Sequence, residues 1–340
     1  MHKVVTMGEM MARFMPAGNQ WIEQASSFQV YYGGDESIVA VSLARFGLDS
    51  VYITRLPDNP LGRAAFQHLR GQGVCTDSVV FGGERLGLNF YENGAAIRPS
   101  KVLYDRAHSA MAEAEPSMFD FGSVFSDADW FHVSGITPAL SEKSRELTET
   151  AMRTASEMGV TVSVDLNYRR KLWSEDEARR VMTGLMEYVD VCIGNEEDAA
   201  ITLGFKPEGT DVYQGSLDVE GYKGVFRQLK EHFGFSTVAS TLRESYSASD
   251  NGWSVLVYDG ETFCQSRKYD IHLVDRGGGG ASFSAGLIYG LITGMSLKET
   301  TEFAAAASAL KQTIVGDFNL VTADEVQHLV DGDVSGRVQR

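Results

Sequence analysis

The chain has little cysteine and few basic residues, and it contains no long apolar run. Its three cysteines, Cys75, Cys192 and Cys264, are widely spaced and form no CxxC pair. This argues against a zinc site and favours a reducing compartment, so we expect a cytoplasmic protein. Only 30 Lys and Arg face 46 Asp and Glu, which gives a formal net charge of −16. We therefore expect no binding of nucleic acid or of an anionic membrane, because both need clustered basic residues.

The N-terminal segment carries no targeting signal. MHKVVTMGEMMARFMP contains one Lys and one Arg, no apolar run approaching about 18 residues and no small-residue cleavage site. We therefore expect neither a signal peptide nor a membrane span. A chain of 340 residues with 43% hydrophobic content is long enough for one large α/β domain, so residues 1–340 are predicted to form a single domain.

Short apolar runs alternate with longer helical segments from about residue 129 onward. Ser141 is a predicted N-cap, and Ser174 with Glu177 is a predicted capping box. Strands are predicted at 129–135, 160–167, 189–195 and 236–241, and helices at 141–159, 174–189, 218–232, 281–293 and 297–314. Repeated β-α-β units with apolar strands indicate a mostly parallel sheet that is covered by helices on both faces.

The N-terminal third has a different pattern. A strand is predicted at 3–9 and a helix at 35–47, but the segments 9–32 and 82–107 are short, polar-alternating and punctuated by glycine. We expect these two segments to form antiparallel strands outside the main sheet. Such a small sheet could close as a lid that excludes water from a phosphoryl donor. The alternative is that the segments are only edge hairpins or a dimer surface.

A run of four glycines leads into the predicted helix 281–293, in the stretch VDRGGGGASFSAGLIYGL (274–291). Glycines 277–280 allow positive φ and close approach of backbone N–H groups to an anion at a helix N-terminus. The loop is therefore a candidate phosphate site. In a kinase, a nearby side chain must take a proton from the attacking hydroxyl, and the methyl group of Ala281 cannot do so.

Several segments together resemble the ribokinase-like, phosphofructokinase B group of sugar kinases, and within it the 2-keto-3-deoxygluconate kinases. The resemblance runs essentially from end to end, including the tail DGDVSGRVQR. The segments are YYGGDESIVAVSLARFG, RLPDNPLGR (55–63), RPSKVLYDRAHSA (98–110), VDLNYRRKLW (164–173), IGNEEDA (193–199), TLRESYSASDNGWS (241–254), VDRGGGGASFSAGL and VGDFNLVT (315–322). It implies a three-layer α/β/α fold with a β-sheet lid, and phosphoryl transfer from ATP to a sugar-acid hydroxyl with Mg²⁺.

At the phosphate end, the resemblance implies a glycine-rich anion hole that is followed by an Asp acting as base. Gly278, Gly279 and Gly280 match the anion hole, and Ala281 stands where the Asp belongs. A positioned general base contributes about 10² to 10⁴ in rate, so the resemblance implies an impaired kinase. The alternative is that Ala281 merely starts the helix and the base is Asp275. We expect Asp275 instead to orient the loop or to help hold a monovalent cation.

At the sugar end, Gly33 and Gly34 match the pair that contacts the sugar. Ile38 stands where these kinases usually carry a substrate-binding Asn, and Asn89 stands where the 2-keto-3-deoxygluconate enzymes have a Tyr. Two more positions depart from the family: Gly277 replaces a usual Val and Gln312 a common His. Because the departures cluster in the pocket, they suggest a site that was retuned or disabled, either naturally or by design.

Two arginines are candidates for the carboxylate of a sugar acid. Arg106 and Arg169 lie in segments that resemble the family's substrate contacts, and each has a tyrosine nearby, Tyr104 and Tyr168 respectively. Arginine suits bidentate binding of a carboxylate. The alternative is that they are ordinary exposed arginines.

The resemblance also implies a nucleotide site. Asn195 and Asp198 match a motif that arranges Mg²⁺ and phosphate, with helix capping by Asn195 as the alternative. Thr241, Arg243 and Glu244 are expected under the nucleotide. The apolar face of Ala306, Ala309 and Leu310 is expected to form a wall for adenine or, alternatively, to be plain core.

Three functions remain open from the sequence. The chain is an impaired 2-keto-3-deoxygluconate-type kinase, a non-catalytic protein that kept the nucleotide or sugar cleft, or a kinase with altered sugar specificity. By resemblance we also expect a homodimer that pairs through the lid, since pairing would cover lid edge strands.

Overall fold

The computed structural model describes residues 2–206 and 218–332, so the tail segment 333–340 lies outside the described residues. The main sheet of this part has the strand order β13-β12-β11-β10-β9-β8-β1-β4-β5, and β14 also pairs with β12. Its strands are β1 (Lys3–Met7), β4 (Asp49–Leu56), β5 (Val79–Phe81), β8 (Trp130–Ser134), β9 (Thr161–Asp165), β10 (Val191–Ile193), β11 (Thr237–Ser245), β12 (Asp250–Tyr258), β13 (Phe263–Gln265) and β14 (Tyr269–His272). The sheet is parallel from β11 through β5, as the sequence predicts. β12 runs antiparallel to β11, β13 and β14 and so adds an antiparallel edge.

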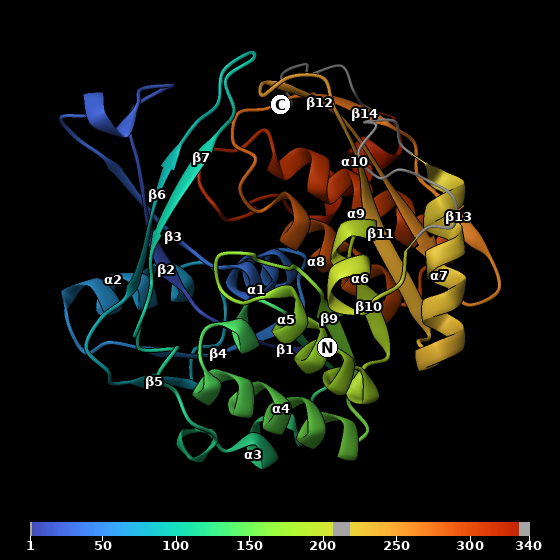
Figure 1. Ribbon diagram of the computed structural model, residues 1–340, viewed down its shortest axis with the longest axis horizontal. Helices are drawn as coiled ribbons and strands as arrows, with labels where there is room; N and C mark the ends of the chain where they lie inside the picture. Colours follow the sequence, from blue (N-terminus) through green and yellow to red (C-terminus); the bar gives the residue numbers. More distant parts are fainter. Residues whose placement is uncertain (1, 207–217, 333–340) are drawn as a thin grey trace.

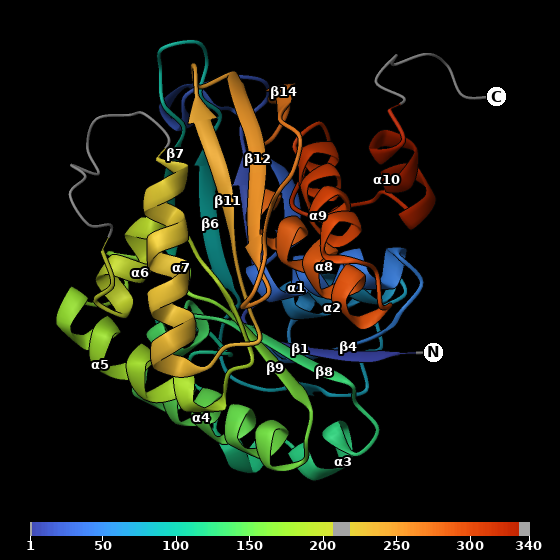
Figure 2. The ribbon, with the colours of Figure 1, turned by 90° about the vertical axis from the view of Figure 1, so that its right-hand side faces the viewer.

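Helices cover both faces of this sheet. The α-helices are α1 (Asp35–Arg45), α2 (Pro60–Arg70), α3 (Phe121–Phe125), α4 (Glu142–Glu157), α5 (Glu175–Leu185), α6 (Glu196–Thr202), α7 (Val219–Phe233), α8 (Gly279–Ile292), α9 (Leu297–Lys311) and α10 (Ala323–Val330). The 3₁₀ turns are η1 (Ile22–Gln24), η2 (Pro116–Met118), η3 (Thr137–Ala139) and η4 (Met186–Tyr188). Figure 2 shows α4, α5 and α7 on one side of the strands and α1, α8 and α9 on the other. The predicted three-layer α/β architecture is confirmed.

The layers enclose two large apolar cores. One core joins the sheet to α4, α5 and α7, with Phe131, Leu147 and Phe226 among its buried members. The other joins the opposite face to α1, α8 and α9, with Phe283 and Phe303 at its centre. Apolar strands that are buried on both faces need helices on both sides, which explains the sequence pattern.

The predicted helix caps are partly confirmed. Ser141 Oγ accepts a hydrogen bond from Ser144 N at 3.1 Å, so Ser141 caps α4. Ser174 likewise accepts from the Glu177 backbone N at 3.2 Å. The reciprocal half of the predicted capping box was wrong, because the Glu177 carboxylate instead pairs with Arg145 across to α4 at 2.6 Å.

A second, four-stranded sheet stands apart from the main one, as Figure 1 shows. Its order is β3 (Gln29–Gly33), β2 (Met11–Met15), β6 (Gly87–Glu92) and β7 (Lys101–Asp105). These strands come from the two segments predicted to lie outside the main sheet. The expectation of wholly antiparallel pairing was wrong, because β2 and β6 pair in parallel, with Arg13 opposite Asn89. The two strands belong to separate excursions from the main sheet that leave it in the same direction.

Within the described ranges, no helix is both long and apolar enough to cross a membrane.

Candidate active site

A cavity of about 650 Å³ lies where the main sheet, the small sheet and the start of α8 meet. Asp165 and Asn167 reach it from the carboxyl end of β9, and Asn195 reaches it from the end of β10. Asn89 and Tyr104 reach it from the small sheet, where they sit opposite each other on β6 and β7. A cavity at the carboxyl ends of parallel strands is where ligands bind in open α/β sheets.

The glycine run forms the floor of this cavity between β14 and α8. Gly278 has φ of +79°, and a Cβ at this position would lie 2.5 Å from the carbonyl oxygen of Asp317, so only glycine fits. α8 begins at Gly279, and the first intrahelical bond to the loop is that of Ser282 N to Gly278 O at 2.9 Å. The preceding amides at the helix start have no intrahelical acceptor, and amides in this position can bind an anion.

A buried ionic group fixes the loop. Asp275 accepts hydrogen bonds from Gly277 N at 2.9 Å and from Gly316 N at 3.0 Å. Its two oxygens also lie 2.9 Å from Arg13 Nη2, and Arg13 Nη1 lies 2.6 Å from Asp317 Oδ1. Burial lowers the pKa of Arg13, but Asp317 and Asp275 raise it by more. Asp275 thus has four polar contacts that hold the loop and does not line the cavity, which disfavours it as the base.

Ala281 lies in the first turn of α8, borders the cavity and is almost fully buried. Its methyl group supplies no proton acceptor. The structure therefore places a small apolar side chain at the position where the resemblance implies a carboxylate.

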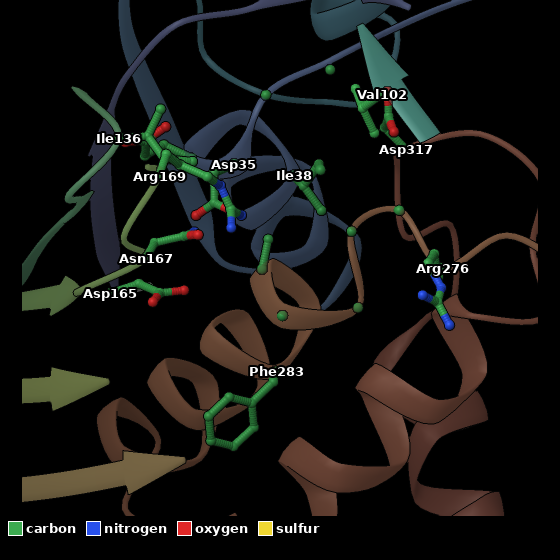
Figure 3. A pocket seen from close by; sticks show the side chains of 18 of the residues that line it. Asp35, Ile38, Val102, Ile136, Asp165, Asn167, Arg169, Arg276, Phe283 and Asp317 are labelled. Atoms are coloured by element: carbon green, nitrogen blue, oxygen red, sulfur yellow. The ribbon is translucent and has the colours of Figure 1, made fainter. Parts of the chain in front are cut away.

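Other side chains that line the cavity do carry carboxylates. Figure 3 shows Asp35 and Asp165 on the same side as Asn167 and Arg169, with Arg276 on the opposite side and Ile38 between. Burial raises the pKa of Asp35, while Arg169 and the Asn167 side chain oppose this rise. Burial, together with neighbouring acids, also raises the pKa of Asp165 well above its usual value. This side of the cavity therefore binds protons more readily than free carboxylates do.

Beneath Asp35, Glu36 is a structural carboxyl. It accepts hydrogen bonds from Ser134 N at 3.0 Å, from Ser134 Oγ at 2.8 Å and from Thr137 Oγ1 at 2.6 Å. Burial and the neighbouring Asp35 raise the pKa of Glu36 to about 7. A side chain on Gly8 would collide with the Glu36 carboxyl, so this contact also requires glycine in the turn after β1.

The two predicted carboxylate-binding arginines differ in their surroundings. Arg106 is buried, and its Nε donates to Glu9 Oε2 at 2.7 Å. Arg106 also lies 5.5 Å from the ring centre of Tyr104. Arg169 is exposed and lines the cavity beside Asp35. Arg169 is therefore the more accessible of the two to an incoming anion.

The remaining predicted sugar contacts meet at one wall. Gly33 and Gly34 line the cavity, and a Cβ at Gly34 would collide with the carbonyl oxygen of Glu9. The Ile38 Cδ1 atom would lie 3.4 Å from a Cβ on Gly278. An apolar side chain from α1 thus packs directly against the anion loop.

The predicted nucleotide contacts are only partly brought together. Thr241 and Arg243 line the cavity, whereas Glu244 does not and instead pairs with Lys268 at 3.3 Å on the strand surface. Ala309 does not line the cavity either. It lies with Ala306 in the buried core between α8 and α9, so the alternative of plain core describes this face.

Asn195 and Asp198 both border the cavity. Asn195 Oδ1 accepts from Asp198 N at 2.8 Å and so caps α6, as the alternative interpretation proposed. Asp198 Oδ1 accepts from Tyr168 N at 3.1 Å, and burial raises the pKa of Asp198 to about 6 although Arg169 opposes this. Oxygen donors of this kind suit Mg²⁺ that is held largely through water and phosphate. In the described part of the chain, no three His, Cys, Asp or Glu side chains are grouped to hold a metal by themselves.

Sequence reasoning missed several cavity residues. Asp35 directly follows the glycine pair Gly33 and Gly34, and this position in the sequence could have indicated that Asp35 lines the cavity. Arg13 and Asp317 carry no local signal, because their partners lie about 300 residues away in the chain. Other residues that line the cavity and were missed include Glu9, Asp165, Asn167, Asn251, Trp253 and Arg276.

Known proteins resemble this chain along nearly its whole length. The profile of the pfkB family of carbohydrate kinases matches residues 1–320. The chain is 35% identical over 334 residues to a 2-dehydro-3-deoxygalactonokinase of Haloferax volcanii, with 98% of each chain covered. It is 29% identical over 322 residues to a 2-dehydro-3-deoxygluconokinase of Bacillus subtilis, covering 93% of this chain and 91% of that protein.

A solved structure shows the same architecture. The crystal structure of 2-dehydro-3-deoxygluconokinase from Thermotoga maritima matches with a TM-score of 0.94 and 48% identity, covering 98% of this chain and 100% of that one. The two sheets, the helical layers and the cavity described above thus belong to a ribokinase-like fold. By sequence and by structure, this chain belongs to the pfkB family of carbohydrate kinases.

Proposed function

We propose that this chain is an ATP-dependent sugar kinase of the 2-keto-3-deoxygluconate type that has lost its general base at position 281. The observation that carries the proposal is the placement of the glycine loop. The loop at the start of α8 opens into the same cavity as Arg106 and Arg169, so one space offers both an anion site for phosphate and cations for a sugar acid.

The phosphate site is proposed to hold ATP, with Mg²⁺. ATP supplies the phosphoryl group, and Mg²⁺ neutralises its charge. The amides of Gly279 and Gly280 would bind phosphate oxygens, since the helix N-terminus favours negative charge. Asn195 and Asp198 would hold Mg²⁺ indirectly, and Thr241 and Arg243 would contact the nucleotide.

The sugar site is proposed on the side of the small sheet. Gly34 and Tyr104 would contact the sugar, and Arg169 would bind its carboxylate, with Arg106 sharing its charge between Glu9 and the substrate. Closure of the small sheet as a lid would exclude water from the phosphoryl group.

The missing base predicts weak activity. Phosphoryl transfer depends mostly on positioning and electrostatic stabilisation, which the loop retains. Removal of a general base costs about 10² to 10⁴ in rate. We therefore expect residual turnover.

Two alternatives have specific support. Ile38 packs on the glycine loop, and Ala281 lies at the start of the helix that follows this loop. Because neither side chain can accept a proton, the pair favours a binding protein without catalysis. Asp35 lies beside Arg169 and would compete with a substrate carboxylate, which favours a kinase for a different sugar.

Calorimetric titration distinguishes these functions. MgATP is titrated first, and then 2-keto-3-deoxygluconate, 2-keto-3-deoxygalactonate and uncharged fructose, with ADP formation followed in parallel. We expect MgATP to bind and the sugar acids to bind more tightly than fructose. Tighter binding of fructose would favour the altered kinase, and binding without any turnover would favour the binding protein. A failure to bind MgATP would reject a nucleotide site.

We also propose a homodimer that pairs through the small sheet. Val30 and Leu103 are apolar side chains that are 41% and 58% exposed. They lie on β3 and β7, the two edge strands of the small sheet. Pairing would cover them and the strand edges. Sedimentation of the wild type and of Leu103→Lys tests this, and the variant should sediment as a monomer.

A further inference from the structure

A lysine ammonium is buried directly beneath the anion loop. Lys311 is the last residue of α9, and its side chain is 0% exposed. Its Nζ donates to the carbonyl oxygen of Ile314 at 3.2 Å, the one hydrogen bond that this ammonium makes within the described ranges. An ammonium has three N–H donors, so most of its hydrogen-bonding capacity is unused.

The Lys311 side chain touches the loop at its most constrained residue. Its Cε would lie 3.1 Å from a Cβ on Gly278, the glycine with φ of +79° that precedes α8. The lysine stem therefore packs against the backbone that shapes the anion site. Movement of the stem would move the loop.

The charges around Lys311 come from three separate elements. Asp275 lies before the loop, Asp317 lies after α9, and Arg13 lies on β2. Both carboxylates already bind Arg13. Burial lowers the pKa of Lys311 to about 8, while the two carboxylates oppose this and Arg13 adds to it. The two carboxylates thus favour the charged form of the ammonium, but both of them are already paired with Arg13.

A buried charge of this kind is expensive when it serves packing alone. A methionine of similar length would fill the same space without the desolvation penalty. The penalty is recovered when an anion enters the neighbouring site, because charges interact strongly where water is excluded. An anion bound at the loop would therefore give this buried charge a role beyond packing.

We propose that Lys311 is a positioning residue whose ammonium serves as a fixed cation beneath the anion loop, so that the chain itself supplies the positive charge that a bound monovalent cation would otherwise supply there. Lys311 holds the Gly278 backbone in place and raises the affinity of the loop for phosphate groups. This inference rests on the proposed function, because it assumes that the loop binds the phosphates of ATP.

The test compares the binding of ATP and of adenosine to wild type, Lys311→Met and Lys298→Met by calorimetry. Lys298 lies on the same helix but is exposed, so its replacement is the matched control. We expect Lys311→Met to weaken ATP binding by about tenfold or more, with adenosine affinity unchanged. Ammonium or methylammonium chloride should restore part of the lost ATP affinity, and an isosmotic sodium salt should restore less. Lys298→Met should bind both ligands as the wild type does.

Four outcomes would overturn the inference. Unchanged ATP binding by Lys311→Met would show that the charge has no role, and equal losses for ATP and adenosine would show a merely structural role. If Lys311→Met does not fold, Lys311→Arg is measured instead. This variant keeps the positive charge and should keep the affinity for ATP. A folded Lys311→Arg protein that has lost ATP affinity would also count against the proposal. A wild type that binds neither ATP nor inorganic triphosphate would instead overturn the proposed function and, with it, this inference.

Discussion

The guanidinium of Arg13 on β2 lies 2.9 Å from both carboxylate oxygens of Asp275, which precedes the glycine loop. Both side chains are almost completely buried. The pair joins the small sheet to the anion loop, two parts of the chain that are 262 residues apart in sequence. The small sheet is therefore anchored beside the glycine loop.

Replacement of Arg13 by Met should destabilise the fold strongly. It would leave Asp275 buried without its cation, and breaking a buried ion pair on one side costs about 3 to 5 kcal/mol. The free energy of unfolding from urea titration measures the loss. The double variant Arg13→Met, Asp275→Asn should recover part of it, because it removes both charges. The single variant Asp275→Asn completes the comparison. If the losses of unfolding free energy in the two single variants add up to the loss in the double variant, the two side chains do not stabilise the fold as a pair.

Replacement of Gly278 by Ala should disrupt the loop, whereas replacement of Gly280 should not. Gly278 has positive φ and would place a Cβ 2.5 Å from the Asp317 carbonyl oxygen, while a Cβ on Gly280 would meet nothing within 4 Å. Strain of this kind costs about 1 to 3 kcal/mol. Thermal unfolding of both variants provides the comparison. Equal stability of the two would contradict the strained loop geometry.

Glu36 should make the stability of the protein depend on pH. Its folded-state pKa of about 7 is above the ordinary value of 4.5, so the folded state holds a proton that the unfolded state has released between these pH values. The contribution of Glu36 to the free energy of unfolding is fully present below pH 4.5 and is lost as pH rises through about 7. The loss amounts to about 3 kcal/mol. Glu36→Gln keeps a neutral side chain and should lack this loss. Parallel stability curves for the two proteins between pH 4.5 and 8 would refute the assignment.

Much of the architecture could be predicted from local sequence patterns. Apolar β-branched runs between amphipathic helices indicated the parallel strands β8 to β11, and the glycine run indicated a loop with positive φ before α8. The antiparallel edge from β12 to β14 could not be predicted in this way. Its strands are joined by short turns without an intervening helix, as where Ser245 of β11 lies opposite Asn251 of β12, so an alternation of strands and helices does not indicate them.

The cavity was less predictable than the fold. The glycines and Ala281 form one continuous motif, so their neighbourhood follows from the sequence. Lys311 reaches the same loop from the end of α9 and Asp317 from beyond it, and nothing in their own sequence shows that the chain turns back there. An alanine stripe on a helix has the same pattern whether it faces a ligand or a neighbouring helix, so the sequence left both interpretations of Ala309 open.

Replacement of Arg169 by Met should weaken the binding of sugar acids selectively. Arg169 is an exposed arginine that lines the cavity, and a hydrogen bond to a charged group contributes about 1.5 to 3 kcal/mol. We expect about a tenfold to hundredfold loss of affinity for 2-keto-3-deoxygluconate, and little change for an uncharged sugar. Arg153→Met, an exposed arginine on α4, is the control and should bind as the wild type does. Equal losses for acid and neutral sugars would show that Arg169 does not recognise the carboxylate.

The most direct test is the steady-state release of ADP with ATP, Mg²⁺ and 2-keto-3-deoxygluconate, measured on the wild type and on Ala281→Asp in parallel. The restored carboxylate should increase turnover by about 10² to 10⁴, because it supplies the missing general base. This result would show that the loop and the cavity are those of a sugar kinase and that Ala281 limits it. If both proteins bind ATP but neither releases ADP, the kinase assignment is contradicted and a binding role takes its place.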